Sequence, residues 1–238
     1  MNRNKTRLLY CSLLWLISLA MLAWCEWPVQ TITREIVFLP GRLIITPSVG
    51  IFLNPINPPA FPEERRLILE WTPILRKGDM SKIILNFVGE RTPILDNSTS
   101  SSIRTNFENV YDIYSINAEA RMELDEMEVN PQGLSGHVLA KGQDVHFTWD
   151  VKPETPGISQ GTAWFYLKLF PKNGNESFEQ AISAQTVSIK VISLLGLNSN
   201  FWRILSVIGL IGGFVILKFE NIKSTFYSKK YKLAGKAK

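Results

Sequence analysis

Apolar and polar residues alternate strictly along several short stretches in the middle of the chain. The clearest runs from Ile116 to Leu124, where every second residue is apolar and the residues between are polar or charged. Similar alternation occurs in residues 67–71, 83–87, 145–151, 163–169 and 187–191. A period of two is typical of a β-strand with one buried face. With about eight short strands and no helical period, this region predicts a mainly β fold, an antiparallel immunoglobulin-like β-sandwich.

The residues between these stretches predict turns and loops. Residues 76–79 (RKGD) predict a turn and residues 155–161 (TPGISQG) a loop, while the slip in alternation at residues 126–129 predicts a β-bulge or bend. A proline-rich passage at residues 48–64 predicts an irregular loop. The polar segment 96–105 is predicted to be mobile. It divides a less regular half, ending at residue 105, from a half with regular strands from residue 116.

A long apolar stretch from Phe201 to Phe219 carries no charge between Ile204 and Leu217. As a helix it would be about 28 Å long, close to the thickness of a bilayer's hydrocarbon core. We therefore predict a transmembrane helix at residues 201–219. Within it, Gly209 and Gly213 have the GxxxG spacing that lets a second helix approach closely, so we predict a helix–helix contact there. The partner is the first apolar helix of the same chain or a second subunit.

That first apolar stretch, Leu8–Cys25, follows a basic N-terminus. It is either a cleaved signal peptide or an uncleaved transmembrane anchor. The anchor is favoured because the run of 18 residues is longer than a usual signal core. Its two cysteines, Cys11 and Cys25, would lie about 21 Å apart along one helix and could not pair there.

Charge is distributed unevenly and predicts the orientation in the membrane. Three basic residues and no acid precede Leu8, and eight basic residues oppose one acid from Arg203 onward. Between these ends, fifteen basic residues oppose twenty acidic residues. Basic residues beside apolar spans mark the cytoplasmic side. We therefore predict a cell-membrane protein with residues 26–200 outside the cytoplasm and both termini inside if the first helix is uncleaved.

This gives five predicted segments: a cytoplasmic N-terminus (1–7), a transmembrane helix or signal peptide (8–25), an exported β-sandwich (26–200), a transmembrane helix (201–219) and a basic cytoplasmic tail (220–238). The basic tail is expected to contact membrane lipid. A nucleic-acid partner is not expected, because so short a tail has no reading module.

Few residues suggest chemistry. His146, Thr148 and Asp150 share one strand face but would spread over about 13 Å, too far to converge on one atom. His137 and His146 lack the spacing of a metal site. The acidic cluster Glu123, Asp125, Glu126 and Glu128 lacks the glycine-centred loop of a calcium site. We expect no catalytic residues, no cofactor and no metal.

Several residues occur in a fixed order along the predicted strands and the loop between them. They are Ala120 and Leu124, residues 149–153 (WDVKP), Gly157, Leu167 and Leu169, and residues 189–191 (IKV) before a membrane span. In this arrangement, residues 116–219 resemble a β-sandwich domain of bacterial membrane-anchored proteins. The resemblance implies the fold and nothing more, and it implies no activity.

The leading hypothesis is a membrane-anchored, non-enzymatic protein that presents an exported β-sandwich as an interaction or accessory module. Its partner would be a protein or a membrane complex, and its oligomeric state is left open. The alternative is an envelope hydrolase acting on carbohydrate or peptide through carboxylates that the sequence does not assign.

Overall fold

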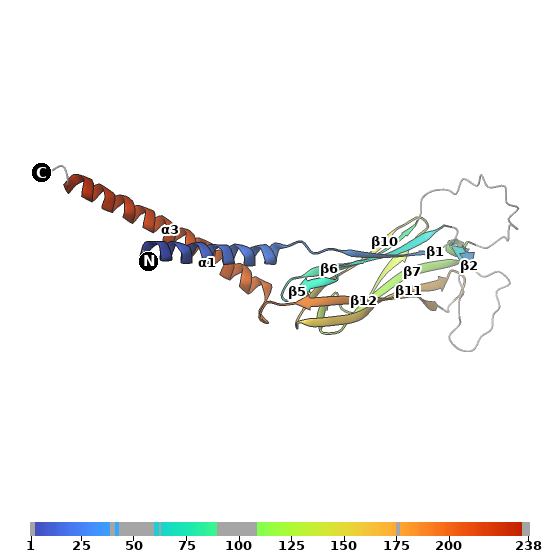
Figure 1. Cartoon of the computed structure of the whole chain (residues 1–238). Helices are drawn as coiled ribbons and strands as arrows, with labels where there is room; N and C mark the ends of the chain where they lie inside the picture. The colour runs from blue at the N-terminus through green and yellow to red at the C-terminus, as the bar shows by residue number, and fades with distance from the viewer. Residues whose placement is uncertain are drawn as a thin grey trace, which may run out of the picture. The chain divides into compact units, whose positions relative to one another are not determined.

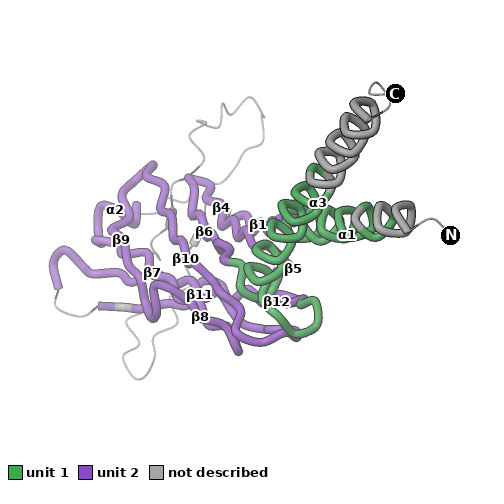
Figure 2. Tube along the Cα trace, turned by 90° about the vertical axis from the view of Figure 1, so that its left-hand side faces the viewer, with its two compact units in different colours: residues 1–28, 76–79, 193–238 green, residues 29–75, 80–192 purple. Residues whose placement is uncertain are grey.

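The computed structural model describes residues 3–38, 41–42, 60–61, 63–89, 109–174 and 177–234. The chain divides into two compact units, shown in different colours in Figure 2. The helix unit contains Met1–Pro28, Arg76–Asp79 and Ser193–Lys238, and the sandwich unit contains Val29–Leu75 and Met80–Ile192. The proline-rich passage lies mostly outside the described residues, and the predicted mobile segment 96–105 lies wholly outside them.

The sandwich unit is built from two five-stranded sheets (Figure 1). The first sheet has the order β1 (Ile32–Phe38), β4 (Arg65–Trp71), β6 (Ser81–Gly89), β10 (Val145–Pro153) and β8 (Met127–Asn130). The second has the order β5 (Ile74–Arg76), β12 (Phe178–Ile192), β11 (Gly157–Pro171), β7 (Tyr114–Leu124) and β9 (Leu134–Leu139). Two short strands, β2 (Gly41–Arg42) and β3 (Ala60–Phe61), pair separately. The prediction of a mainly β, two-sheet fold is therefore confirmed.

The alternating stretches become strands with one buried face. Burial alternates residue by residue along β4, and β7 buries Ile116, Ala118, Ala120 and Met122 in the same way. Side chains from both sheets meet in one hydrophobic core. Phe87 of β6 and Phe165 of β11, for example, have ring centroids 4.8 Å apart. The amphipathic alternation thus determines which face of each strand joins the core.

One local prediction in this region was right in part and another was wrong. The chain bends after Leu124 as predicted, but it does so through a tight turn at Asp125–Glu126, after which β8 joins the opposite sheet by pairing with β10. The predicted loop at residues 155–161 is strand from Gly157 onward, because β11 pairs there with β12. Gly161 is required at this point, since a Cβ would overlap the backbone of β7.

Strand β9 and helix α2 are among the elements that were not predicted. Strand β9 places Leu134 and Val138 on its exposed face, so its apolar residues do not mark the core. The short helix α2 (Val110–Ile113) begins after Asn109, whose side chain caps it by accepting from the Tyr111 amide. A hydrogen bond also links the two sheets: the indole of Trp71 in β4 donates to the Ser188 carbonyl in β12 at 3.3 Å.

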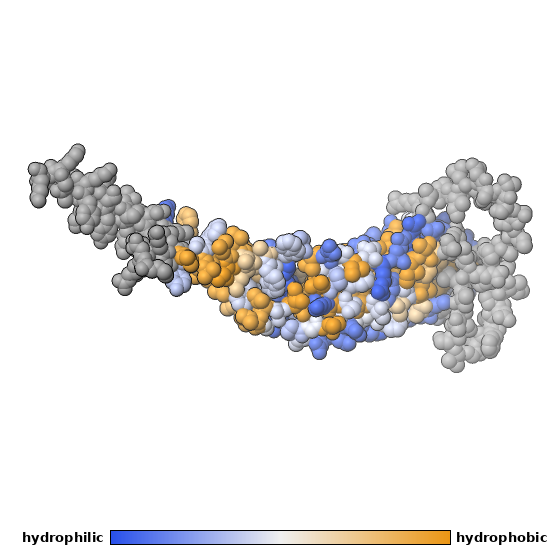
Figure 3. Space-filling view, in the orientation of Figure 1, coloured by the Kyte–Doolittle hydropathy of each residue, from blue (hydrophilic) through white to orange (hydrophobic). Residues whose placement is uncertain are grey.

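The helix unit contains α1 (Arg3–Glu26) and α3 (Ser199–Ala234). Among the described residues, one segment is long and apolar enough to cross a membrane, Ser199–Ile216 of α3. The apolar part of α1, Ser12–Glu26, is shorter. Hydrophobic residues gather over the described surface of these helices in Figure 3. The structure thus supports one apolar span, and a second span remains a prediction.

Helix α3 is longer than the predicted transmembrane segment. It continues through residues 220–234, where the chain contains neither glycine nor proline before Gly235. The lysine and aromatic side chains of this predicted cytoplasmic tail lie outside the described part of the chain.

Candidate functional site

The contact between α1 and α3 is the candidate functional site, and it contains the two glycines singled out from the sequence. Gly209 lies against Ser18 of α1, and a Cβ at position 209 would overlap the Ser18 hydroxyl. A Cβ at Gly213 would lie 3.4 Å from the Trp15 ring. The adjacent Gly212 has no such neighbour within 4 Å. Close approach of the helices therefore depends most on the missing side chain at position 209.

Buried residues on the two helices follow the spacing expected of packed helices. Among the described side chains of α3 they are Ser199, Trp202, Ser206 and Gly213, with the half-buried Gly209 between the last two. On α1, Ser18 and Cys25 are buried seven residues apart. Spacings of three, four and seven residues place side chains on one helix face. The contact surface is thus a stripe of small residues on each helix, with Trp202 at one end.

A cluster of charged residues lies at the Trp202 end of the helix contact. We call Glu26, Arg76, Asp79, Ser199 and Arg203 the polar collar. All five belong to the helix unit, although Arg76 and Asp79 come from the turn between β5 and β6. The predicted turn at residues 76–79 is present, with Lys77 and Gly78 at its tip.

Arg203 is the main cation of the polar collar. Its Nε donates to Glu26 Oε1 at 2.9 Å, and its guanidinium lies 3.1 Å from Asp79 Oδ1. It also donates to the Cys25 carbonyl at 3.4 Å. Glu26 and Cys25 end α1, whereas Arg203 is in the second turn of α3. A charge at the start of an apolar helix is costly unless it is paired, and here two carboxylates pair with it.

Asp79 connects the turn to α3. Its Oδ1 accepts from the Ser199 hydroxyl at 2.5 Å, and its other oxygen lies 3.6 Å from Arg76. The backbone adds a bond from the Ser199 amide to the Lys77 carbonyl at 2.8 Å. A carboxylate beside the first turn of a helix is also stabilised by the free amides and the helix dipole.

Arg76 extends the polar collar to the residues after α1. It donates to the Trp27 carbonyl at 2.6 Å, and its guanidinium lies over the Trp24 ring, 5.5 Å from the centroid. The polar collar therefore joins the end of α1, the start of α3 and the turn 76–79 through several charge-assisted bonds. Such an arrangement can position the two helices and the turn.

Sequence reasoning did not predict the polar collar. Asp79 and Ser199 are 120 residues apart, so only the tertiary structure brings them together. One feature of the sequence could have predicted part of it. Glu26 follows the first apolar stretch and Arg203 lies near the start of the second, and their charges are opposite. Two antiparallel apolar helices would place these residues side by side.

The histidines considered from the sequence do not form a site with each other. The Nδ1 of His146 lies 2.8 Å from Asn86 Oδ1, on the exposed face of the first sheet. His137 lies on β9, where its ring packs against Phe147 at 5.2 Å between centroids. His146 and Thr148 are exposed and Asp150 is half-buried along the same face of β10.

The predicted acidic cluster is divided among different partners. Glu123 pairs with Arg121 at 3.0 Å, and Glu128 lies 3.7 Å from Lys152. Glu126 accepts from Thr155 at 2.8 Å. Among the described residues, no group of three or more histidine, cysteine or acidic residues is placed to hold a metal ion.

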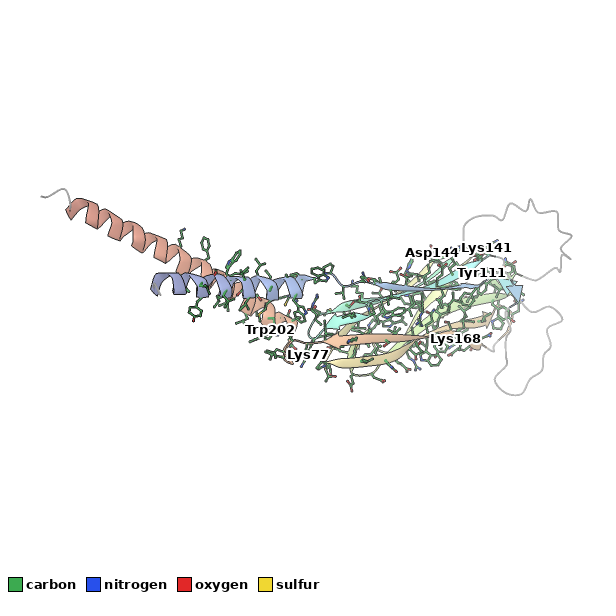
Figure 4. All side chains as sticks on the ribbon, in the orientation of Figure 1. Lys77, Tyr111, Lys141, Asp144, Lys168 and Trp202 are labelled. Atoms are coloured by element: carbon green, nitrogen blue, oxygen red, sulfur yellow. The ribbon has the colours of Figure 1, made fainter. Side chains whose placement is uncertain are left out.

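The sandwich unit also contains a buried polar cluster that the sequence did not predict. Arg65 is completely buried and donates to Glu63 Oε1 at 2.6 Å and to the Tyr111 hydroxyl at 2.6 Å. It also donates to the carbonyls of Gln143 and Ala140. Figure 4 shows Tyr111 near the turn that carries Lys141 and Asp144. Arg65 lies two residues before Leu67 and four before Leu69, so it is on the same, buried face of β4. This spacing could have predicted from the sequence that its side chain points inward.

Burial raises the pKa of Tyr111. Arg65 opposes this increase, while the hydrogen bond to Glu63 at 2.9 Å adds to it. The tyrosine therefore stays protonated and donates to the carboxylate. The cluster satisfies its own donors and acceptors, which is the behaviour of a structural element rather than a binding site.

No protein-family model matches the chain, and no curated protein matches it. Among solved structures, a chain of the complex between zinc 2-glycoprotein and prolactin inducible protein from human seminal plasma is 11% identical. The match covers 50% of this chain and 86% of that chain, with a TM-score of 0.30. The alpha-2-macroglobulin of E. coli is 14% identical over 55% of this chain and 8% of its own, with a TM-score of 0.31. At these TM-scores the likenesses carry no argument about fold or function.

Proposed function

We propose that this chain is a membrane-anchored accessory protein that displays its β-sandwich outside the cytoplasm as a binding module. The observation that carries the proposal is the pair of apolar helices in the helix unit. It combines an apolar segment of membrane-spanning length, Ser199–Ile216, with a second apolar helix packed on it through Gly209 and Ser18. Small residues at such contacts are typical of helix pairs in membranes.

Charge supports the proposed orientation. The residues after the apolar part of α3 are strongly basic, whereas the region between the helices is net acidic. A basic segment is retained on the cytoplasmic side of a membrane. The sandwich is therefore on the other side, and both termini are cytoplasmic if α1 is uncleaved.

The proposed role of the sandwich is to bind a protein or a membrane complex, and it requires no catalysis. An immunoglobulin-like topology is part of this proposal. The sandwich unit suits such a role because its own side chains form its described core, while outer-face residues such as His146 and Thr148 of β10 are exposed. Sheet faces and free strand edges are common protein-binding surfaces.

A native complex tests the proposed role. The full chain, expressed at its natural level and extracted in mild detergent, should elute with a stoichiometric partner, measured by light scattering and mass spectrometry. Membranes washed with alkaline carbonate should retain the chain. A monomer that binds no envelope component would contradict the module role, and release by carbonate would contradict the anchor.

A further inference from the structure

An apolar turn directly precedes α3 and exposes a leucine at its tip. Residues 194–197 (LLGL) form a tight turn in which the Leu197 amide donates to the Leu194 carbonyl at 3.1 Å. Leu195, at its tip, has a φ of 53° and is 82% exposed. The left-handed region is disfavoured for a residue with a branched side chain, and leucine is rarely found there.

The turn is held in place, so Leu195 is presented in a defined position. The buried indole of Trp202 donates to the Leu194 carbonyl at 3.0 Å, and Lys77 donates to the Gly196 carbonyl at 3.2 Å. Figure 4 labels Trp202 and Lys77, which lie together near the start of α3. The bond from Trp202 places the turn beside the first helical turn of α3.

Other apolar side chains around the start of α3 are also exposed. Leu197 and Phe201 are each more than two-fifths exposed, and Trp27, after α1, is 70% exposed. All of them belong to the helix unit and lie within a few residues of a helix end. Tryptophan is enriched at this position along membrane helices, where its ring lies in the interfacial layer of the bilayer.

A second turn in the described chain provides a useful contrast. Among the described non-glycine residues, Glu126 is the other one with positive φ, at 57°. Glu126 is charged and its carboxylate accepts a hydrogen bond from Thr155. Leu195 instead exposes an apolar side chain at a disfavoured φ, and the described residues of the chain leave most of that side chain uncovered.

We propose that the Leu194–Leu197 turn inserts into the interfacial layer of the bilayer, with Leu195 as its apolar tip. This rests on the proposed membrane span of α3. Lipid is the partner because the turn is hydrogen-bonded to the first turn of that span, at the level where the helix enters the bilayer. Insertion transfers the Leu195 side chain from water to the boundary between headgroups and acyl chains.

Depth-dependent quenching in liposomes tests the proposal with the full chain. Cys11 is replaced by alanine and Cys25 by serine, and single cysteines are introduced by Leu195→Cys, Ile208→Cys and Glu126→Cys. Each is labelled with the fluorophore NBD and reconstituted into phosphatidylcholine–phosphatidylglycerol vesicles. The vesicles carry a nitroxide quencher either near the headgroup or near the end of the acyl chain.

We expect the label at 195 to lose emission to the shallow quencher, the label at 208 to the deep quencher and the label at 126 to neither. A label at 195 that keeps its emission while the label at 208 is quenched would overturn the insertion and leave the anchor intact. If the label at 208 also keeps its emission, the membrane span fails and the insertion fails with it.

Discussion

At the scale of single residues, a few side chains account for specific features of each unit. Gly209 permits contact with Ser18, and Gly161 permits close contact between β7 and β11. In the interior of the sandwich unit, Arg65 donates a hydrogen bond to Tyr111, and Tyr111 donates one to Glu63. Each of these roles depends on the size or the hydrogen-bonding capacity of one side chain, so single substitutions test them.

Tyr111→Phe should lower the free energy of unfolding by about 1–3 kcal/mol, because Arg65 and Glu63 each lose a buried partner. Tyr166→Phe, on the outer face of β11, is the control and should change it by less than about 0.5 kcal/mol. Denaturant unfolding of the full chain in detergent, followed by tryptophan fluorescence, measures both. Equal losses in the two variants would contradict the role of the buried cluster.

Alkaline pH provides a second test of Tyr111. Because burial raises its pKa above the ordinary value of about 10, its contribution to stability is complete below that pH and is lost as the pH rises above it. The wild-type chain should therefore lose stability more steeply above about pH 10 than Tyr111→Phe does. Unfolding midpoints measured across this range check the difference. Parallel curves would contradict it.

Gly209→Ala should weaken the contact between α1 and α3 by about 1–3 kcal/mol, because the new methyl group overlaps Ser18. Gly212→Ala is the matched control, since its methyl group meets open space and alanine favours a helix. Hydrogen exchange of the α1 amides in detergent measures the contact. Adding Ser18→Gly to Gly209→Ala should restore protection, and failure to do so would argue against this packing.

At the scale of elements, alternation in the sequence predicted the strands that bury every second residue, all apolar over the predicted stretch, in the core. Strands β4, β6, β7 and β10 are of this kind. Alternation failed for β9, because Leu134 and Val138 are exposed. It also failed for the first residues of β11, where serine, glutamine and glycine carry no apolar signal. These segments become strands because their neighbours offer backbone hydrogen bonds, which a local pattern does not record.

The candidate site was predictable only where its residues are close together in the sequence. The spacing of Gly209 and Gly213 is local, so the sequence contains the signal for a close helix contact. The polar collar depends on Asp79, which reaches α3 only through the fold. Pairing between distant charges cannot be read from composition or periodicity.

Asp79→Asn should loosen the polar collar, because Arg203 and Arg76 would lose a shared carboxylate that is largely buried. We expect faster hydrogen exchange in residues 76–80 and in the first turn of α3. Glu128→Gln is the control, because its pair with Lys152 is more than half exposed at both side chains and should contribute less than about 1 kcal/mol. Unchanged exchange in Asp79→Asn would show that the carboxylate does not hold the turn.

At the scale of the whole molecule, the chain consists of a sandwich unit and a helix unit that includes both terminal helices. The apolar span, the small-residue contact and the charge distribution all agree with one arrangement in a membrane. In that arrangement the helix unit is the anchor, the apolar turn at Leu195 lies in the interfacial layer, and the sandwich is the displayed part.

The orientation of the sandwich is the central claim, and cysteine labelling in intact cells tests it most directly. In a chain lacking Cys11 and Cys25, Lys141→Cys places a thiol on an exposed turn of the sandwich unit, and Lys236→Cys places one in the basic tail. A membrane-impermeant maleimide should label position 141 in intact cells and position 236 only after permeabilisation. Labelling of position 236 but not 141 in intact cells would contradict the account.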